Sequence, residues 1–309
     1  MTSTIHWPEP KAWKERHPDL RGLCEVAVTE LRSSDSPRDH SLIYVAEMTD
    51  DVLKALGACK GCLLVLNQCD QARCEPLERD HAVLYSADPR YRFAEVLRPL
   101  WDHRSLRGTL IWDQTRGIAV GTDVKIDSSV TVEAGVTIAG DCVIGPGAYI
   151  MSGARIGPRV RIGEETVIRE NAVVGGYGFG IARMAGKPPI RIPHIGGVVL
   201  GRDVEIGAFT TVCSGTINPT VLEDYVKIDD HVHVAHNCHV GEGVFITACA
   251  EISGSVRIGK ATWVAPGCTI LNGISIGADC LLMIGAVLTK SLPDAYKAGG
   301  HTAKAFPKS

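Results

Sequence analysis

Residues 120–168 read VGTDVKIDSSVTVEAGVTIAGDCVIGPGAYIMSGARIGPRVRIGEETVI, and an aliphatic side chain returns at every sixth position of this stretch. The aliphatic series runs through Val120, Ile126, Val132, Ile138, Ile144, Ile150, Ile156, Ile162 and Ile168. The same step reaches Val174, returns at Leu200, Ile206 and Val212, and then holds from Leu222 to Leu288. A fixed period of this kind indicates a repeat architecture.

A second, smaller apolar residue usually stands two positions before each aliphatic one, as Val124 stands before Ile126. Residues two apart share one face of a strand, so each hexad predicts a short strand with one buried face, followed by a turn. An α-helix cannot present this period on one face. Three such strands close a triangular coil of about eighteen residues, which predicts a mainly β fold, the parallel β-helix built of hexapeptide repeats.

Composition limits the class of protein. The chain has 309 residues, of which 45% are hydrophobic and 6% aromatic, so a large core of Val, Ile and Ala is expected. The net charge of −3 gives no reason to expect nucleic acid as a partner. The first residues, MTSTIHWPEPKAWKER, lack the apolar core of a signal peptide, and no apolar run is long enough to cross a bilayer. We therefore expect a cytoplasmic protein without a membrane span.

The cysteines fall into two groups. Four occupy the small inward position of a hexad and are expected to be core thiols: Cys142, Cys238, Cys268 and Cys280. Four others form a CxxC followed by a looser pair, the better candidates for zinc: Cys59, Cys62, Cys69 and Cys74. Because Cys62 opens the run CLLVLN, which predicts a buried strand, we expect no metal there.

The sequence predicts a small α/β domain over residues 1–108, because the six-residue period is absent there. Expected strands cover Leu20–Leu31, Ser41–Val45, Cys62–Leu66 and Ala82–Tyr85, and expected helices cover Thr49–Ala58 and Pro89–Trp101. A short charged linker, Asp102–Gly108, leads to the β-helix, expected over 109–290, and residues 291–309 form a C-terminal tail.

Two interruptions of the repeat mark the expected functional region, since function concentrates on loops held by a regular scaffold. The first, 175–198, opens with GGYGFG and closes with IPHIGG. The second, 213–221, reads CSGTINPTV. Both closely precede HVHVAHNC, residues 231–238, which contains His236.

His236 follows the inward Val234 by two residues, so it is expected at a corner of the prism, pointing outward. A histidine near its ordinary pKa suits a general base at neutral pH. Gly254 lies eighteen residues further on, one full coil away, and its N–H is a candidate donor to an oxyanion. In the first interruption, Tyr177 and Phe179 are candidates to shape an acyl or sugar pocket.

The order of an α/β domain, a hexapeptide array, a GFG loop, IPHIGGVVLGRDVEIGA and KIDDHVHVAHN resembles the UDP-3-O-acylglucosamine N-acyltransferase family of lipid A biosynthesis, from about Ser41 to Gly277. The resemblance implies a left-handed helix and a homotrimer with active sites between subunits. It further implies acyl transfer from an acyl carrier protein thioester to the amine of a nucleotide-linked amino sugar, with no permanently bound cofactor.

The resemblance also implies roles for single residues. His236 matches the catalytic histidine of the family, Asp229 a carboxylate that orients the imidazole, and Gly254 the backbone donor. Tyr44 matches one of two aromatic residues that hold uracil. His194 and Asn237 are expected to bind substrate.

The chain departs from the family pattern at several positions. The second uracil-binding aromatic falls at Asp50, a second family histidine falls at Gly273, and the charged run expected after Val212 is replaced by Cys213, Ser214 and Gly215. The ending GAVLTKSLPDAYKAGGHTAKAFPKS is similar to that of sugar acetyltransferases that use coenzyme A. An alternative is therefore an acyl-CoA-dependent N-acyltransferase acting on a nucleotide-linked amino sugar for O-antigen or another surface polysaccharide.

Two further classes stay open. The spacing of His194, His231 and His236 resembles that of the zinc ligands in hexapeptide-fold carbonic anhydrases, which suggests a zinc hydratase if the three side chains converge. A non-catalytic β-helix scaffold or binding module is the other class, because a fold alone does not give a function.

Overall fold

The computed structural model describes residues 7–100 and 109–299. It contains two compact units, Met1–Leu106 with Gly180–Pro193, and Arg107–Phe179 with His194–Ser309. The expected linker Asp102–Gly108 and the end of the expected tail, from residue 300, lie outside the described residues. No helix of the described residues is both long enough and apolar enough to span a membrane.

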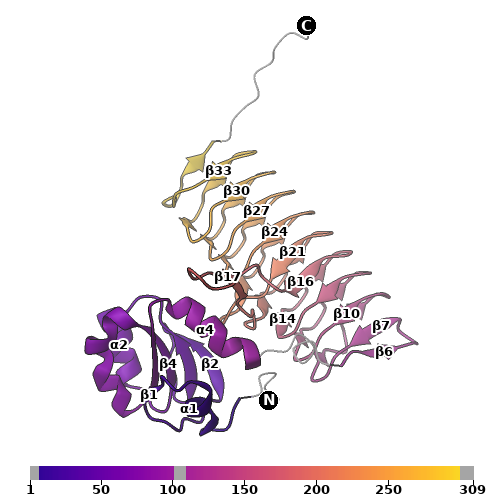
Figure 1. The fold of residues 1–309 in the computed structure, drawn as a ribbon. Helices are drawn as coiled ribbons and strands as arrows, with labels where there is room; N and C mark the ends of the chain where they lie inside the picture. The colour runs from indigo at the N-terminus through magenta and orange to yellow at the C-terminus, as the bar shows by residue number, and fades with distance from the viewer. Residues whose placement is uncertain (1–6, 101–108, 300–309) are drawn as a thin grey trace. The chain divides into compact units, whose positions relative to one another are not determined.

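The N-terminal unit contains a five-stranded sheet in the order β1-β5-β4-β3-β2, in which only β1 is antiparallel to its neighbour (Figure 1). Its strands are β1 Arg21–Gly22, β2 Glu30–Ser33, β3 Ser41–Tyr44, β4 Leu63–Asn67 and β5 Ala82–Ser86. The prediction of a single strand over Leu20–Leu31 is wrong. The two ends of this segment belong to β1 and β2, which lie at opposite edges of the sheet, so the chain between them must cross the sheet.

Short helices connect these strands. They are α1 Ala12–Arg16, α2 Asp50–Gly57, η1 Gln68–Asp70, α3 Gln71–Cys74, η2 Glu75–Arg79, α4 Pro89–Leu97 and η3 Arg98–Leu100. The Thr49 hydroxyl caps α2 by accepting from the Val52 N–H at 3.2 Å. Asp88 caps α4, with Pro89 in the first turn of the helix, where a missing N–H costs nothing. The helices expected over 49–58 and 89–101 are confirmed within one or two residues over the described part.

Residues 180–193, which the sequence places in a loop of the β-helix, belong to the N-terminal unit instead. They form an antiparallel pair of strands, β17 Ile181–Ala182 and β18 Ile190–Arg191. This hairpin is held to α4, since the Tyr91 hydroxyl donates to the Pro188 carbonyl at 2.9 Å and Lys187 pairs with Glu95 at 3.0 Å. Residues 180–193 lie within the expected β-helix range of 109–290, but these contacts tie them to the N-terminal unit.

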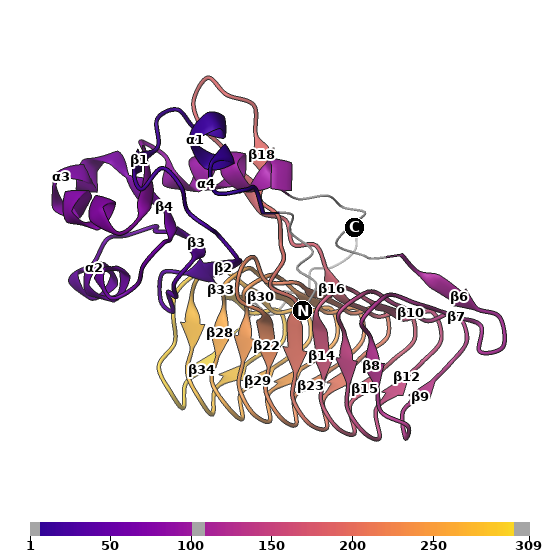
Figure 2. The same ribbon diagram turned by 90° about the horizontal axis from the view of Figure 1, so that it is seen from below.

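The second unit is a stack of triangular coils, visible as ladders of short strands in Figures 1 and 2. One wall is a ten-stranded sheet of β6 Ile111–Asp113, β7 Ile118–Val120, β10 Thr137–Ile138, β13 Arg155–Ile156, β16 Val173–Gly176, β21 Thr211–Cys213, β24 His233–Val234, β27 Glu251–Ile252, β30 Thr269–Ile270 and β33 Val287–Leu288. The second wall is an eight-stranded sheet of β8 Lys125–Ile126, β11 Val143–Ile144, β14 Val160–Ile162, β19 Val198–Leu200, β22 Thr220–Leu222, β25 His239–Val240, β28 Arg257–Ile258 and β31 Ser275–Ile276.

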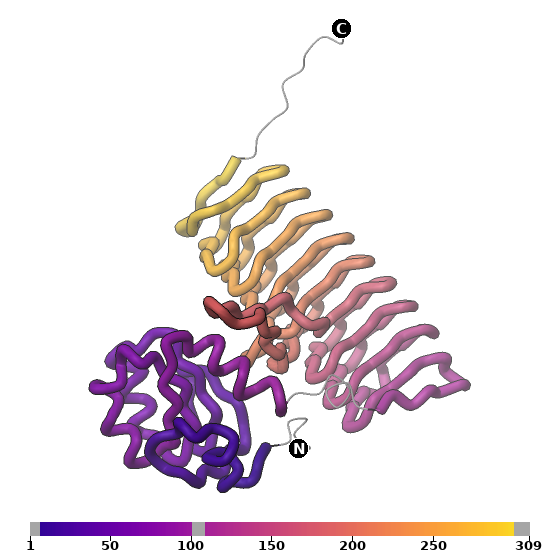
Figure 3. The backbone as a smooth tube through the Cα atoms, viewed as in Figure 1, coloured from indigo at the N-terminus to yellow at the C-terminus, as the bar shows by residue number. Residues whose placement is uncertain are grey.

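The third wall is a nine-stranded sheet of β9 Thr131–Val132, β12 Tyr149–Ile150, β15 Val167–Ile168, β20 Glu205–Ile206, β23 Lys227–Ile228, β26 Phe245–Ile246, β29 Trp263–Val264, β32 Leu281–Leu282 and β34 Lys297–Ala298. β34 pairs with β32, so the coil stack continues beyond residue 290, into the expected tail. Figure 3 shows the coils stacked one on another along the chain.

The repeat positions form the core of this unit. Ile138 pairs in register with Ile156, and Ile150 with Ile168, so equivalent residues of successive coils stack. The aliphatic and small inward residues belong to one buried cluster that runs the length of the stack. The predicted left-handed parallel β-helix, preceded by a small α/β domain, is confirmed.

The four thiols expected in the coil interior are buried, and burial raises the pKa of Cys142 to about 11 and that of Cys238 to about 12. Cys142 and Cys238 therefore stay protonated at neutral pH, and all four buried side chains act as small apolar residues. In the N-terminal unit, Cys59, Cys62 and Cys74 are buried while Cys69 is exposed. Within residues 7–100 and 109–299, no three side chains of His, Cys, Asp or Glu are arranged to hold a metal ion.

Candidate functional site

Both interruptions leave the prism at the same corner, formed by the turns that join the ten-stranded sheet to the eight-stranded sheet. The first lies between β16 and β19, and the second between β21 and β22. The next turn of this corner, between β24 and β25, carries His236 and Asn237. We call these turns the His236 corner. The expectation that His236 lies at a corner, close to both interruptions, is confirmed.

The His236 side chain lies between two glycines, Gly178 at its Cβ and Gly254 at its ring. A Cβ on Gly178 would lie 2.8 Å from the Cβ of His236 and 2.8 Å from Nε2 of His194. A Cβ on Gly254 would lie 2.8 Å from Cε1 and 3.0 Å from Nε2 of His236. Since real Cβ atoms do not approach other atoms so closely, only glycine fits at both positions without moving the ring. The ring is therefore held between the first interruption and the next coil.

His194 returns from the first interruption directly against His236. The two ring centroids are 4.7 Å apart and the ring planes are tilted by 59°. His194 is buried, whereas His236 is half-buried. The structure therefore brings together three expected site residues, His194, His236 and Gly254, in one cluster.

Asn237 connects His236 to the second interruption. Its backbone is left-handed, with φ of 61°, a conformation that asparagine tolerates better than most residues. The side-chain Oδ1 accepts from the Thr216 N–H at 2.7 Å, and Nδ2 lies 3.1 Å from both the Thr216 hydroxyl and Nδ1 of His236. The Asn237 N–H also donates to the Thr220 hydroxyl at 2.9 Å. The amide of Asn237, expected to bind substrate, is thus occupied by groups of its own chain.

The two interruptions are joined to each other below this turn. The Ile195 N–H donates to the Thr216 carbonyl at 3.0 Å, and the Gly197 N–H donates to the Ser214 hydroxyl at 2.8 Å. Gly215 must be a glycine, because a Cβ there would lie 1.9 Å from the Asn218 carbonyl oxygen. Residues 213–215, where the sequence departs from the family pattern, therefore pack closely against the first interruption.

Asp229 and His231 lie at a different corner, where the nine-stranded sheet turns into the ten-stranded sheet. The carboxylate of Asp229 accepts from the backbone N–H groups of Asp230 and Ala248, at 2.8 and 3.1 Å. His231 stacks on Phe209 with ring centroids 5.3 Å apart. Within one chain, the structure does not bring Asp229 to His236, and it does not bring His231 to the pair of His194 and His236.

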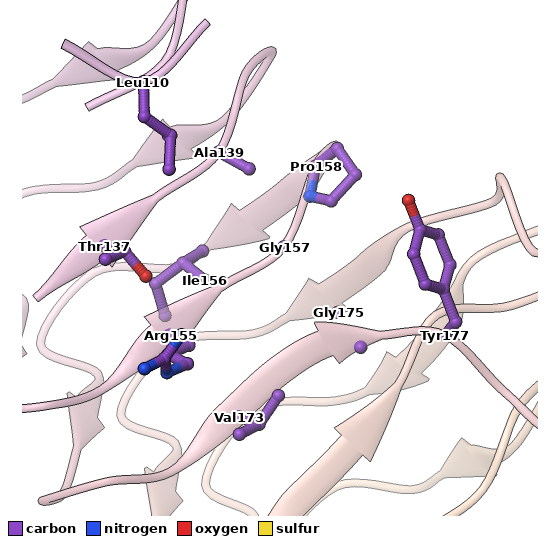
Figure 4. A pocket seen from close by; sticks show the side chains of 11 residues that line it. Leu110, Thr137, Ala139, Arg155, Ile156, Gly157, Pro158, Val173, Gly175 and Tyr177 are labelled. Atoms are coloured by element: carbon purple, nitrogen blue, oxygen red, sulfur yellow. The ribbon is translucent and has the colours of Figure 1, made fainter. Parts of the chain in front are cut away.

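Tyr177 lines a pocket on the outer face of the ten-stranded sheet, and Phe179 is largely exposed. Figure 4 shows the ring of Tyr177 at one side of this pocket, with Pro158 and Leu110 among the other lining residues. The other lining residues are Thr137, Ala139, Arg155, Ile156, Gly157, Val173, Gly175 and Gly176. The pocket is partly apolar, with Arg155 as its charged member, and the role of Tyr177 in binding an acyl or sugar group stays a prediction.

Tyr44 lies in the N-terminal unit, at the end of β3. Its ring stacks on Phe93 of α4 with centroids 5.4 Å apart, and burial raises the pKa of its hydroxyl, so the side chain is neutral at pH 7. Asp50, which stands where the family has the second aromatic residue, pairs with Arg73. The aromatic neighbour of Tyr44 is therefore Phe93, a residue that the sequence interpretation assigned only to a helix.

Two site residues were missed from the sequence. Gly178 belongs to the GGYGFG run, and a glycine-rich loop was a signal that some backbone there approaches another group closely. Thr216 carried no such signal, because its hydrogen bonds to Asn237 depend on how the second interruption folds back. Gly178 lies against His194 and His236, and Thr216 binds Asn237.

We expect Gly178→Ala to lower the rate of the site's reaction about tenfold to a hundredfold, because the new methyl group must displace His194 and His236. The far-ultraviolet circular dichroism spectrum should remain that of the wild type. Gly57→Ala is the matched control, since a Cβ at that position meets no atom within 4 Å. Equal rates in Gly178→Ala and the wild type would show that the ring positions do not matter.

The fold is that of the hexapeptide-repeat β-helices. The family description "Bacterial transferase hexapeptide (six repeats)" matches residues 141–176 and 219–254. The structure of LpxA from Acinetobacter baumannii superimposes with a TM-score of 0.55 at 22% identity, covering 62% of this chain and 72% of that one. At this identity, the likeness shows the fold alone.

Curated relatives are more similar in sequence. A UDP-3-O-acylglucosamine N-acyltransferase of Cupriavidus metallidurans is 40% identical over 139 residues, which is 44% of this chain and 37% of the relative. One of Herminiimonas arsenicoxydans is 36% identical over 123 residues, 40% of this chain and 35% of the relative. The chain thus matches little more than a third of the length of these homologues.

Proposed function

We propose that this protein is an N-acyltransferase that moves an acyl group from a thioester to the amine of a nucleotide-linked amino sugar. The observation that carries the proposal is the placement of His236, at the corner where both interruptions leave the coil, with its Cε1–Nε2 edge against Gly254. The names of the relatives, UDP-3-O-acylglucosamine N-acyltransferases, support the reaction and the class of acceptor.

In the proposed reaction, the amine of the sugar attacks the thioester carbonyl and forms a tetrahedral oxyanion. His236 takes a proton from the attacking nitrogen, and the intermediate collapses to an amide and a free thiol. The Gly254 N–H, which makes no backbone hydrogen bond within the described residues, is the proposed donor to the oxyanion. Only His236 and this N–H touch the reacting atoms in this scheme.

His194 and Asn237 support His236 from either side rather than contacting the acceptor, because both are engaged with its ring. Tyr177 and Phe179 adjoin Gly178, which lies against His236, and are proposed to contact acyl or sugar groups. Asp229 is exposed at another corner, so any role in orienting His236 requires the Asp229 of a neighbouring subunit. This requirement agrees with the homotrimer, with active sites between subunits, that we propose.

The donor is an acyl group carried as a thioester on the phosphopantetheine of an acyl carrier protein, or on coenzyme A. The proposed protein holds no permanent cofactor and works in the cytoplasm, where both donors occur. A pathway leading to lipid A has the support of the relatives' names. A pathway leading to O-antigen or another surface polysaccharide is the second candidate, because residues 213–215 depart from the family pattern.

Within one chain, His194 and His236 are adjacent while His231 lies at another corner with Asp229, so a zinc hydratase would need His231 of a neighbouring subunit as its third ligand. Metal bound to the purified protein would distinguish this alternative. A non-catalytic scaffold gives no reason for a half-buried histidine side chain fitted between two glycines, which favours the acyltransferase over a scaffold.

The proposal is tested by incubating the purified protein with two donors, 3-hydroxyacyl carrier protein and short acyl-CoA. The acceptors are UDP-3-O-acylglucosamine and a panel of other nucleotide-linked amino sugars. Release of thiol and the mass of the product are measured. An amide product from any of these pairs supports the proposal, and its identity selects the donor and the pathway. Absence of transfer from both donors to every acceptor would overturn it.

We expect Tyr44→Ala to weaken binding of a uridine or other pyrimidine nucleotide about tenfold, because stacking on an aromatic ring contributes about 1–3 kcal/mol per base. Isothermal titration with UDP measures the change. Tyr85→Ala is the control, since Tyr85 is an aromatic residue of the same sheet, on strand β5. Unchanged affinity in Tyr44→Ala would exclude this ring from nucleotide binding.

A further inference from the structure

The hydrogen bonds of Asn237 fix which nitrogen of His236 carries its hydrogen. An amide has one end that accepts and one that donates. In Asn237 the accepting end is identified by the Thr216 backbone N–H, which can only donate and lies 2.7 Å from Oδ1. The amide therefore points its two Nδ2 hydrogens at the remaining neighbours, the Thr216 hydroxyl and Nδ1 of His236, each 3.1 Å away.

An amide nitrogen cannot accept a hydrogen bond, so Nδ1 of His236 must be the acceptor in this contact. A neutral imidazole has one accepting and one donating nitrogen, and the donating one is then Nε2. The charged imidazolium would place an N–H on Nδ1 against the donor of Asn237, so this contact disfavours the charged ring. Gly254 and the titratable His194 also pack on this ring, and Gly178 packs on its Cβ.

We propose that Asn237, held by Thr216 of the second interruption, is a positioning residue that keeps the resting His236 neutral with its hydrogen on Nε2. This inference rests on the proposed function and deepens it. For Nε2 to take the proton of an amine, Nε2 must first release its hydrogen to water, and Nδ1 must gain one from water. The number of protons on the ring is unchanged by this exchange, but Asn237 must turn away or lose its bond. The second interruption, through Thr216 and Asn237, thereby opposes the transfer of the ring hydrogen from Nε2 to Nδ1.

The substitution Asn237→Asp reverses this preference. A carboxylate at this position can still accept from the Thr216 N–H, but it also accepts from an Nδ1–H and leaves the lone pair on Nε2. The negative charge beside the ring favours imidazolium, so the pKa of His236 should rise by about one unit or more. Because the reaction needs the neutral ring, the acid limb of the pH profile of kcat/KM should move to higher pH by the same amount.

The test is nitrogen NMR of the full-length protein with ¹⁵N-labelled histidine, recorded above the pKa of the rings. The His236 signals are identified by their absence in His236→Gln. We expect the wild type to show a protonated Nε2 and an unprotonated Nδ1, and Asn237→Asp to show the reverse. Asn171→Asp is the matched control, because Asn171 also has a left-handed backbone, with φ of 58°, but lies at a different corner. It should leave the His236 signals unchanged.

A protonated Nδ1 in the wild type, or an unchanged pattern in Asn237→Asp, would overturn the inference. The NMR result does not depend on any substrate. If the protein shows the expected hydrogen position but transfers no acyl group, the proposed function fails and the assignment of Asn237 as a positioning residue of the ring stands. If it transfers acyl groups with Nδ1 protonated, the function stands and the inference fails.

Discussion

His236→Ala is expected to lower the rate of acyl transfer a hundredfold or more, because a general base contributes about 10²–10⁴ to a rate. The ring of His194 is 4.7 Å away, but it is buried behind that of His236. The loss should fall on kcat, while KM for the sugar changes little, because His236 acts mainly on the transition state. Steady-state kinetics with the preferred donor and acceptor measures both constants.

The control for this substitution is His233→Ala. His233 lies in the same coil, as the outward residue of β24, but at the middle of a wall rather than at the corner. Its removal should leave kcat within a few-fold of the wild type. Turnover of His236→Ala close to that of the wild type would remove His236 from the reaction.

Ile270→Ala is expected to destabilise the protein by about 2–5 kcal/mol, because it opens a cavity in the stacked core of the β-helix. Ile270 is fully buried and pairs in register with Ile252 and Leu288 of the neighbouring coils. The surrounding aliphatic side chains are held by the coils above and below, so the cavity cannot collapse fully. Denaturation in guanidinium chloride, followed by circular dichroism, measures the loss.

Thr269→Ala is the matched control for this prediction. Thr269 is the adjacent residue of β30, but its side chain points outward and is exposed. Surface substitutions of this kind usually change stability by less than about 0.5 kcal/mol. Equal stability of the two variants would contradict the assignment of inward and outward positions from the repeat.

The β-helix could be predicted from the sequence because its core residues recur at every sixth position. Ile150 and Ile168 differ by one coil, and their pairing follows from counting alone. The position of His236 at a corner followed in the same way from the inward Val234. In the N-terminal unit, by contrast, the two ends of the segment between Leu20 and Leu31 lie at opposite edges of a sheet. This pairing depends on strands distant in sequence, so it could not be predicted from the local sequence pattern.

The surroundings of His236 could be predicted only in part. Gly254 is one coil away in a regular array, so its approach to the ring was accessible from the spacing. Gly178 and His194 contact His236, and Thr216 contacts Asn237, from interruptions whose path depends on contacts distant in sequence. The hairpin of residues 180–193 is held to α4 by Tyr91 for the same reason, and its place in the N-terminal unit was not foreseen.

We propose that the His236 corner forms an amide from a thioester and an amino sugar. The most direct measurement is the release of free thiol by the wild-type protein with and without a nucleotide-linked amino sugar, combined with mass spectrometry of the sugar. The account predicts thiol release that depends on the free amine, with one acyl group added to the sugar as an amide. Thiol release that is independent of the acceptor, or no release with any acceptor of the panel, would contradict it.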